Sequence, residues 1–261
     1  MSGDARLQEI WLRSVEALRD VVREMKITED ELHLAGRYFN RLGQSGMFPS
    51  LLDVAFAMAS IDATRLDIGG TRPNLEGPYY VARAPLRSDG VLFDRNPGPD
   101  AAILTLTGRV IDVETASGIA EAELDIWQAD QYGRYDRDGF YLRGVVRTGA
   151  DGSYTIRTVV PDDYSEHDGD PIGELFRAMG QDNHRAAHIH LKIRIDGVEQ
   201  LMTQLFIPHS KCLNDDYVVG AVSDDLVLAL KGAHPVAGQG PQFTARFDFA
   251  VRRHPAAQAA E

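Results

Sequence analysis

Residues 188–195 read HIHLKIRI, a run in which polar and aliphatic side chains alternate at every position. Successive side chains of a β-strand point to opposite faces of a sheet, so the aliphatic residues predict one buried face. His188 and His190 then share the other face, where two imidazoles can bind one metal ion. Two hydrogen-bonded histidines without a metal are an equally good interpretation of this pair taken alone. The stretch therefore predicts a strand that carries a candidate metal site.

Other stretches in the second half of the chain show the same alternation, namely ILTLTGRVIDV, AELDIW, LRGVVRT, SYTIRTVV, QLMTQLFI and FTARFDFAV. Turn residues separate them, with Asp196-Gly197 between two strands and Ala150-Asp151-Gly152 before another. Both are hairpin signals. Short strands joined by tight turns, with little helix between them, favour an antiparallel β-sandwich over a parallel sheet. We therefore predict a mainly β domain, an antiparallel β-sandwich, over residues 71–261.

The first seventy residues predict a small helical module instead. Residues 4–25 carry apolar side chains at helical spacing, namely Leu7, Ile10, Trp11, Val15, Leu18, Val22 and Met25. Thr28 with Glu31 three residues later is a capping-box pattern and predicts a second helix, and a third is expected after Ser50. Because the apolar stripe of the first helix must be buried, residues 1–70 are predicted to be a dimerisation module.

Composition excludes several classes of partner. The formal net charge is −12, with 39 acidic against 27 basic residues, which argues against nucleic acid as a partner. No segment approaches the ~20 apolar residues that span a bilayer, and the N-terminus has no apolar signal region, so we predict a cytoplasmic protein without a membrane anchor. The single cysteine, Cys212, cannot form an internal disulfide and is expected to be a small buried residue.

Two tyrosines lie where loops should leave the sandwich, Tyr135 and Tyr164. A phenolate is a hard anionic oxygen donor that suits Fe(III), and metal binding lowers the phenol pKa. Either tyrosine taken alone is more often a half-buried packing residue. No carboxylate lies two residues from either histidine, and the nearest are Asp182 and Asp196. Tyr132, three residues before Tyr135, is a competing oxygen donor by sequence alone.

Five ordered segments give the chain a resemblance to a known family: EGPYYVARAP at 76–85, LDIWQADQYGRYD at 124–136, ADGSYTIRTVVPDDY at 150–164, HRAAHIH at 184–190 and TQLFI at 203–207. The chain resembles the intradiol ring-cleavage dioxygenases, which act on catechols, chlorocatechols, hydroxyquinol and protocatechuate. The helical module also resembles the dimer-forming region of the catechol branch. An ordered set of this kind is more specific than any one motif.

The resemblance implies an enzyme that uses O₂ to open a catechol between its hydroxyl carbons, giving a cis,cis-muconate. It implies one non-haem Fe(III) per subunit, with Tyr135, Tyr164, His188 and His190 as ligands. The alternative substrate is hydroxyquinol, which would give maleylacetate. The sequence departs from the family where Arg185-Ala186-Ala187-His188 replaces the usual Arg-Pro-Ala-His.

Three catalytic roles are also implied by the resemblance. Tyr164 matches the ligand that leaves the iron and takes up a substrate proton. Arg185 is the expected fixed cation near the reacting ring, although a salt bridge to Asp182 is an alternative role for it. Gln204 is expected to orient oxygen atoms by hydrogen bonding.

The resemblance further implies the walls of the substrate pocket, which are Asp53, Val54, Leu75, Pro78, Tyr79, Gly220 and Ala221. Asp53 and Tyr79 resemble the chlorocatechol and hydroxyquinol branches, and small residues at Gly220 and Ala221 would leave room for a ring substituent. A substituted catechol is therefore favoured. A homodimer, with a lipid at its helical interface, is a further expectation from the family.

Two rival functions are open from the sequence. One is a sandwich of the transthyretin type that binds a ligand without chemistry, and the other is a zinc hydrolase that combines His188 and His190 with a carboxylate such as Asp182. Both rivals predict a colourless protein, whereas phenolate bound to Fe(III) absorbs visible light.

Overall fold

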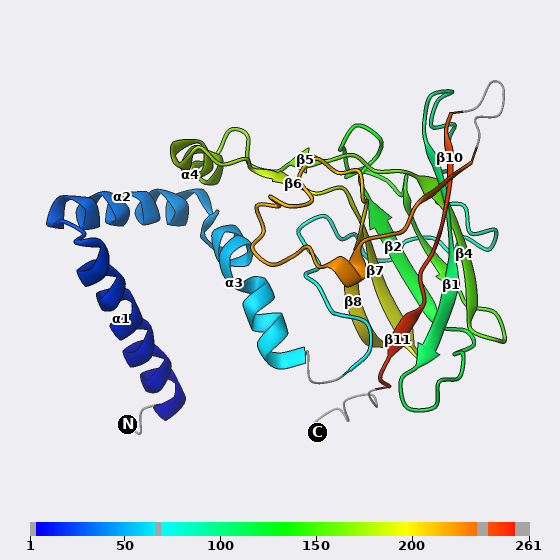
Figure 1. Ribbon diagram of the computed structural model, residues 1–261, viewed down its shortest axis with the longest axis horizontal. Helices are drawn as coiled ribbons and strands as arrows, with labels where there is room; N and C mark the ends of the chain where they lie inside the picture. The colour runs from blue at the N-terminus through cyan, green and yellow to red at the C-terminus, as the bar shows by residue number, and fades with distance from the viewer. Residues whose placement is uncertain (1–3, 66–68, 234–239, 254–261) are drawn as a thin grey trace. The chain divides into compact units, whose positions relative to one another are not determined.

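The structure is a computed structural model that describes residues 4–65, 69–233 and 240–253 (Figure 1). The chain forms two compact units, Met1–Pro49 and Ser50–Glu261. The division falls near the start of the third helix, so most of that helix belongs to the second unit. The functional boundary expected between residues 70 and 71 stays a prediction.

The first unit consists of the two predicted helices, and both are confirmed. Helix α1 spans Ala5–Met25, and Asp4 caps its start by accepting a hydrogen bond from the backbone N–H of Leu7 at 3.1 Å. Helix α2 spans Glu29–Ser45 and begins with the expected capping box of Thr28 and Glu31. In the described part of the chain no residue of α1 is buried, so its apolar stripe is exposed.

Helix α3 spans Phe48–Arg65 and begins earlier than the sequence predicted. The expected start after Ser50 was wrong, because Pro49 is tolerated in the first turn of a helix, where its missing N–H is not needed. Val54 and Met58 bury their side chains, and the Val54 carbonyl accepts a hydrogen bond from the backbone N–H of Val219 at 3.0 Å. This contact fixes α3 within the second unit.

The described residues include no single helix that is long and apolar enough to cross a membrane, although Glu29–Ser45 and Phe48–Thr64 together reach that length and composition.

Two large sheets form most of the second unit, which confirms the mainly β prediction and the antiparallel sandwich (Figure 1). The first sheet has the order β3 (Arg143–Arg147), β2 (Glu123–Gln128), β7 (His188–Ile195) and β8 (Val198–Phe206), all antiparallel. The second sheet is built on β1 (Ile103–Asp112), with β4 (Ser153–Val159), β9 (Lys231–Ala233), β10 (Gln242–Arg246) and β11 (Phe249–Val251). Here β1 pairs in parallel with β10 and β11, which the alternation did not indicate.

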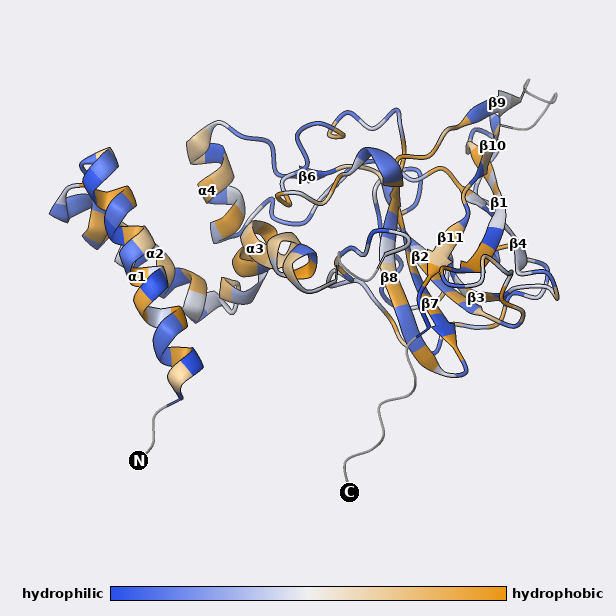
Figure 2. Cartoon of the chain, turned by 60° about the horizontal axis from the view of Figure 1, so that its bottom comes forward, coloured by the Kyte–Doolittle hydropathy of each residue, from blue (hydrophilic) through white to orange (hydrophobic). Residues whose placement is uncertain are grey.

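The longer strands are stable because they bury one face or both. Burial alternates along most of β1, whereas in β7 the aliphatic residues Ile189, Leu191 and Ile193 are fully buried. Figure 2 shows apolar and polar bands alternating along β8. The predicted turn at Asp196-Gly197 connects β7 to β8 with both residues at positive φ, 52° and 78°, as a tight hairpin turn requires.

Short elements that the alternation did not reveal complete this unit. They are β5 (Tyr164–Ser165), α4 (Pro171–Met179), β6 (His184–Arg185) and the 3₁₀ helix η2 (Asp224–Leu226). Strands β5 and β6 pair with Tyr164 opposite Arg185. This small ribbon therefore brings two candidate site residues together. Helix α4 could have been predicted, because Asp170 and Pro171 form a common start signal for a helix.

Candidate metal and substrate site

Strand β7 presents His188 and His190 on one face, with their Nε2 atoms 2.9 Å apart. The Nδ1 atom of His188 lies 2.6 Å from the carbonyl oxygen of Ala186. When the Nδ1–H group of His188 donates to that carbonyl, the lone pair lies on Nε2. This is the arrangement found in metal-binding histidines. Burial and then the Arg185 charge lower the pKa of His188, and burial also lowers the pKa of His190. Both imidazoles are therefore neutral, as metal ligands must be.

Tyr135, from the loop after β2, and Tyr164, from β5, lie beside these histidines. Their ring centroids are 5.2 Å apart, and those of Tyr164 and His188 are 5.6 Å apart. Tyr132 is 68% exposed, so the competing tyrosine does not lie in this buried cluster. Burial raises the pKa of both Tyr135 and Tyr164, so each phenol is protonated unless a cation binds beside it.

The donor set fits a ferric ion. Within the described ranges, the Tyr135 hydroxyl is buried without a hydrogen-bond partner. Buried polar atoms without partners are rare in folded proteins, so such atoms point to a missing ligand. Two phenol oxygens that become anionic on binding, together with two neutral imidazoles, suit Fe³⁺ better than a softer metal.

The zinc interpretation lacks its third ligand. Asp182 hydrogen-bonds His184, and both of these side chains are largely exposed. In residues 4–65, 69–233 and 240–253 no three His, Cys, Asp or Glu side chains come together to hold a metal ion. In the described part of the chain, the rings of Tyr135 and Tyr164 lie beside the histidine pair instead.

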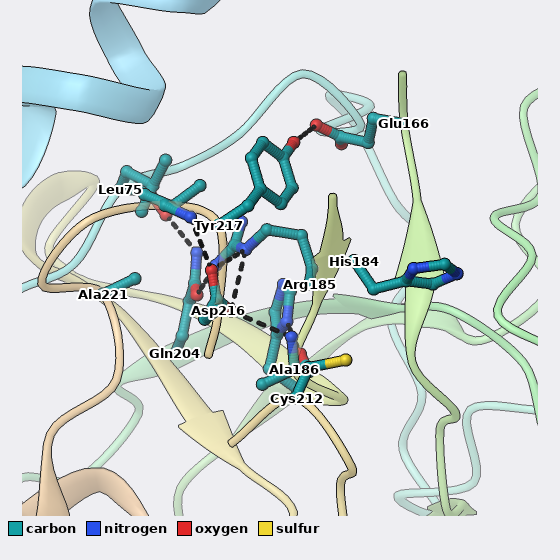
Figure 3. Close-up of polar contacts among 12 residues, drawn as sticks. Leu75, Glu166, His184, Arg185, Ala186, Gln204, Cys212, Asp216, Tyr217 and Ala221 are labelled. Carbon is teal, nitrogen blue, oxygen red and sulfur yellow. Dashed lines mark hydrogen bonds and ion pairs between the residues drawn. The ribbon is translucent and has the colours of Figure 1, made fainter. Parts of the chain in front are cut away.

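Arg185 lies in a buried hydrogen-bond network with Asp216 and Gln204 (Figure 3). Its Nε donates to Asp216 at 2.9 Å, and its Nη2 donates to the Gln204 side-chain oxygen at 2.9 Å. The alternative salt bridge to Asp182 was wrong, because the partner is Asp216. Gln204 in turn donates to the Leu75 carbonyl at 2.8 Å, and it lies directly opposite His190 in the β7–β8 register.

Aromatic rings pack against the donors from both sides. Trp127 stacks on His190 with ring centroids 4.8 Å apart, and Tyr79 stacks on Tyr135 with centroids 4.3 Å apart. Trp127 was not predicted as a site residue. It could have been found by aligning the strands, because it is the β2 register partner of His190.

The residues predicted to line the substrate pocket are divided among several places. Asp53, Leu75 and Pro78 line one pocket of about 530 Å³, whereas Val54 lines another of about 610 Å³. Tyr79 belongs to the tyrosine cluster.

The remaining two predicted wall residues, Gly220 and Ala221, lie beside the segment before Leu75. Their carbonyl groups accept hydrogen bonds from Arg72 and Asn74. The structure thus brings the four donors, Arg185, Gln204 and Tyr79 together more tightly than it does the other predicted wall residues.

Two family models together match nearly the whole chain. The family described as "Dioxygenase" matches residues 75–253, and "Catechol dioxygenase N terminus" matches residues 4–64. A hydroxyquinol 1,2-dioxygenase from Rhizobium sp. (strain MTP-10005) is 33% identical over 83% of this chain and 77% of its own length. A catechol 1,2-dioxygenase from Acinetobacter lwoffii is 32% identical over 86% of this chain and 76% of its own length.

Solved structures agree with these relatives. The 3-chlorocatechol 1,2-dioxygenase of Rhodococcus opacus 1CP superposes with a TM-score of 0.86 at 28% identity, over 95% of this chain and 99% of that one. The hydroxyquinol 1,2-dioxygenase of Pseudomonas putida DLL-E4 gives a TM-score of 0.84 at 27% identity, over 97% of this chain and 94% of that one. The chain therefore belongs to the intradiol ring-cleavage dioxygenases, a family of oxidoreductases.

Proposed function

We propose that this protein cleaves catechol, or a substituted catechol such as chlorocatechol, between its two hydroxyl carbons with O₂, giving a cis,cis-muconate. The observation that carries the proposal is the buried convergence of two tyrosines and two histidines, with the histidine Nε2 atoms 2.9 Å apart. Tyr135, Tyr164, His188 and His190 would hold one Fe³⁺ per subunit. Ferric iron bound there would take both catechol oxygens and make the ring reactive towards O₂.

Tyr164 is the proposed acceptor of a substrate proton. Its side chain is buried, and burial raises its pKa well above that of a phenol in water. A Tyr164 phenolate therefore binds a proton more strongly than a solvated phenolate does. A catechol hydroxyl must lose its proton to bind as an anion, and the raised proton affinity of Tyr164 supports its role as the acceptor of that proton.

Arg185 is the proposed electrostatic group. Its side chain is 2% exposed, and the Asp216 carboxylate and Gln204 amide hold its guanidinium in one place. A fixed cation in a site without water stabilises negative charge that develops on the reacting substrate. The expected role of Gln204 in orienting oxygen atoms stays a prediction, and its bond to Arg185 supports a positioning role as well.

The alternative substrate is hydroxyquinol, which would be opened to maleylacetate. It is favoured by the hydroxyquinol 1,2-dioxygenase relative at 33% identity. Relatives named for catechol and chlorocatechol lie close behind at 32% and 31%. Identities this similar do not separate the branches, so the choice between them must come from side chains in the site.

Homodimerisation through α1 is part of the proposal. The apolar side chains of α1 are exposed, with Trp11 67% and Leu18 66% accessible. A second copy would bury this stripe and gain roughly 25 cal/mol for each Å² of apolar surface removed from water. A lipid at that interface and a cytoplasmic location stay predictions.

The visible spectrum of the aerobically purified protein tests the proposal. We expect a broad band from tyrosinate bound to Fe(III), which shifts to longer wavelength when catechol is added without O₂. Admitting O₂ should then give the ultraviolet absorption of a muconate. A colourless protein with full iron occupancy would contradict the assignment of Tyr135 and Tyr164.

A further inference from the structure

Glu166 is a carboxylate close to the tyrosine cluster that the proposed chemistry does not use. It lies two residues after Tyr164, immediately beyond strand β5. Strand β5 pairs with β6, and this pairing sets Tyr164 opposite Arg185. Glu166 therefore continues a ribbon that carries both a proposed iron ligand and the proposed electrostatic group.

Tyr217 fixes the position of this carboxylate. The Tyr217 hydroxyl donates to Glu166 Oε2 at 2.7 Å, and Figure 3 shows the ring of Tyr217 pointing at Glu166. Two backbone features fix the position of Tyr217. It directly follows Asp216, the ion-pair partner of Arg185, and its backbone N–H donates to the His184 carbonyl at 3.3 Å. The pair is therefore anchored to the same network as Arg185.

The other oxygen of Glu166 has no such bond. Among the residues that the structure describes, Oε1 of Glu166 is buried and has no hydrogen-bond partner. A buried acceptor left without a donor costs free energy, so an unpaired one next to a substrate site indicates that a ligand supplies the donor. The only proton of the Tyr217 hydroxyl is already given to Oε2, so Tyr217 cannot supply it.

We propose that Glu166, oriented by Tyr217, determines specificity for catechols whose ring carries a hydrogen-bond donor, such as a third hydroxyl or an amine. This inference rests on the proposed function and names the substrate class for the same site. The substituent donates to Oε1, and the carboxylate charge strengthens that bond. The same charge disfavours a ring that carries an anionic substituent.

The test compares kcat/KM for hydroxyquinol with kcat/KM for catechol in the iron-loaded enzyme. In Glu166→Leu, which keeps the bulk but has no acceptor, the ratio should fall about 10- to 100-fold, the range for a hydrogen bond to a charged group. Glu166→Gln keeps one acceptor and should lose less. Tyr217→Phe should also lower the ratio, because the carboxylate is no longer oriented.

A substrate with an anionic substituent tests whether the Glu166 charge disfavours negative charge on the ring. Relative to catechol, 3,4-dihydroxybenzoate should be cleaved faster by Glu166→Gln than by the wild type. Dissociation constants measured by titration calorimetry without O₂ should follow the same order for hydroxyquinol, catechol and 3,4-dihydroxybenzoate, which separates binding from chemistry. Asp168→Asn is the matched control, because it removes an exposed carboxylate two residues further along and should leave every ratio unchanged.

The outcomes separate this inference from the proposed function. The role of Glu166 would be overturned if the ratio of kcat/KM for hydroxyquinol to kcat/KM for catechol were unchanged in both Glu166→Gln and Tyr217→Phe. This test holds even if Glu166→Leu fails to fold. A wild-type enzyme that cleaves catechol but prefers it to hydroxyquinol would also overturn that role. A wild-type protein that contains iron but cleaves no catechol would instead overturn the proposed function.

Discussion

Arg185 and Asp216 form a buried ion pair in which the Arg185 Nε atom lies 2.9 Å and 3.1 Å from the two carboxylate oxygens. The two side chains are only 2% and 3% exposed. Burial lowers the pKa of Arg185, but the charge of Asp216, the nearby Tyr164 and Tyr217 and the hydrogen bond to Asp216 together outweigh burial, so the pKa lies above its ordinary value. Asp216 also accepts the backbone N–H of Ala186 at 2.9 Å. One carboxylate thus holds both the cation and the backbone just before His188.

Replacing Asp216 with alanine should lower the free energy of unfolding by about 3–5 kcal/mol, because the Arg185 charge would stay buried without its partner. Urea denaturation followed by circular dichroism measures this change. Asp215→Ala is the control, since Asp215 is exposed and a surface substitution usually changes stability by less than about 0.5 kcal/mol. Equal stability of the two variants would show that the ion pair of Asp216 with Arg185 does not stabilise the fold.

A site residue could be predicted from the sequence when its partners lie close to it along the chain, and not when they lie far away. His188 and His190 could be placed together from the sequence because a strand alone puts alternate residues on one face. The partnership of Arg185 with Asp216 could not, since those residues are 31 positions apart and meet through loop structure. The alternation of β1 likewise predicted a strand but not its parallel partners, because pairing between distant strands depends on the whole fold.

Tyr135 and Tyr132 offer a matched test of the ligand assignment, since they lie three residues apart and only Tyr135 lies in the cluster. Tyr135→Phe removes a phenol oxygen without changing the ring. We expect the visible band to be lost or strongly altered and kcat/KM for catechol to fall at least about 100-fold, since even indirect changes at metal sites cost 10- to 100-fold. Tyr132→Phe, at a side chain that is 68% exposed, should keep both. The reverse pattern would assign the ligand to Tyr132.

The backbone of Gly77 lies close to His190, and a substitution at Gly77 tests whether this close approach matters for activity. A Cβ atom at Gly77 would lie 3.5 Å from His190 Cε1 and 4.0 Å from Nε2, and the residue has a φ of +71°. Gly77→Ala should lose about 1 kcal/mol of stability from the left-handed conformation and lower kcat/KM at least about tenfold. Gly46→Ala is the control, because its φ is +73° and nothing lies within 4 Å. It should lose similar stability but keep its activity.

Leu18 lies on the exposed apolar stripe of α1, where 66% of its surface is accessible. If that stripe forms the dimer interface, Leu18→Lys should raise the dissociation constant of the dimer by about tenfold or more, because a buried unpaired charge is costly. Sedimentation equilibrium measures the change. Glu9→Gln, on the opposite face of the helix, also adds one unit of positive charge and should leave the dimer intact. A dimer unchanged by Leu18→Lys would place the interface elsewhere.

Cys212 is 7% exposed, and burial followed by the charge of Asp163 raises the pKa of its thiol to about 11. Only the thiolate reacts with alkylating reagents, and a raised pKa keeps the thiol neutral below that value. At pH 8 the thiolate fraction is therefore about 200 times smaller than that of an exposed cysteine with a pKa of about 8.5. We expect iodoacetamide to label the folded protein very slowly at pH 8, faster as the pH rises towards 11, and rapidly in concentrated urea. Fast labelling of the folded protein at pH 8, followed by intact-mass spectrometry, would show instead that the thiol is accessible and ionised.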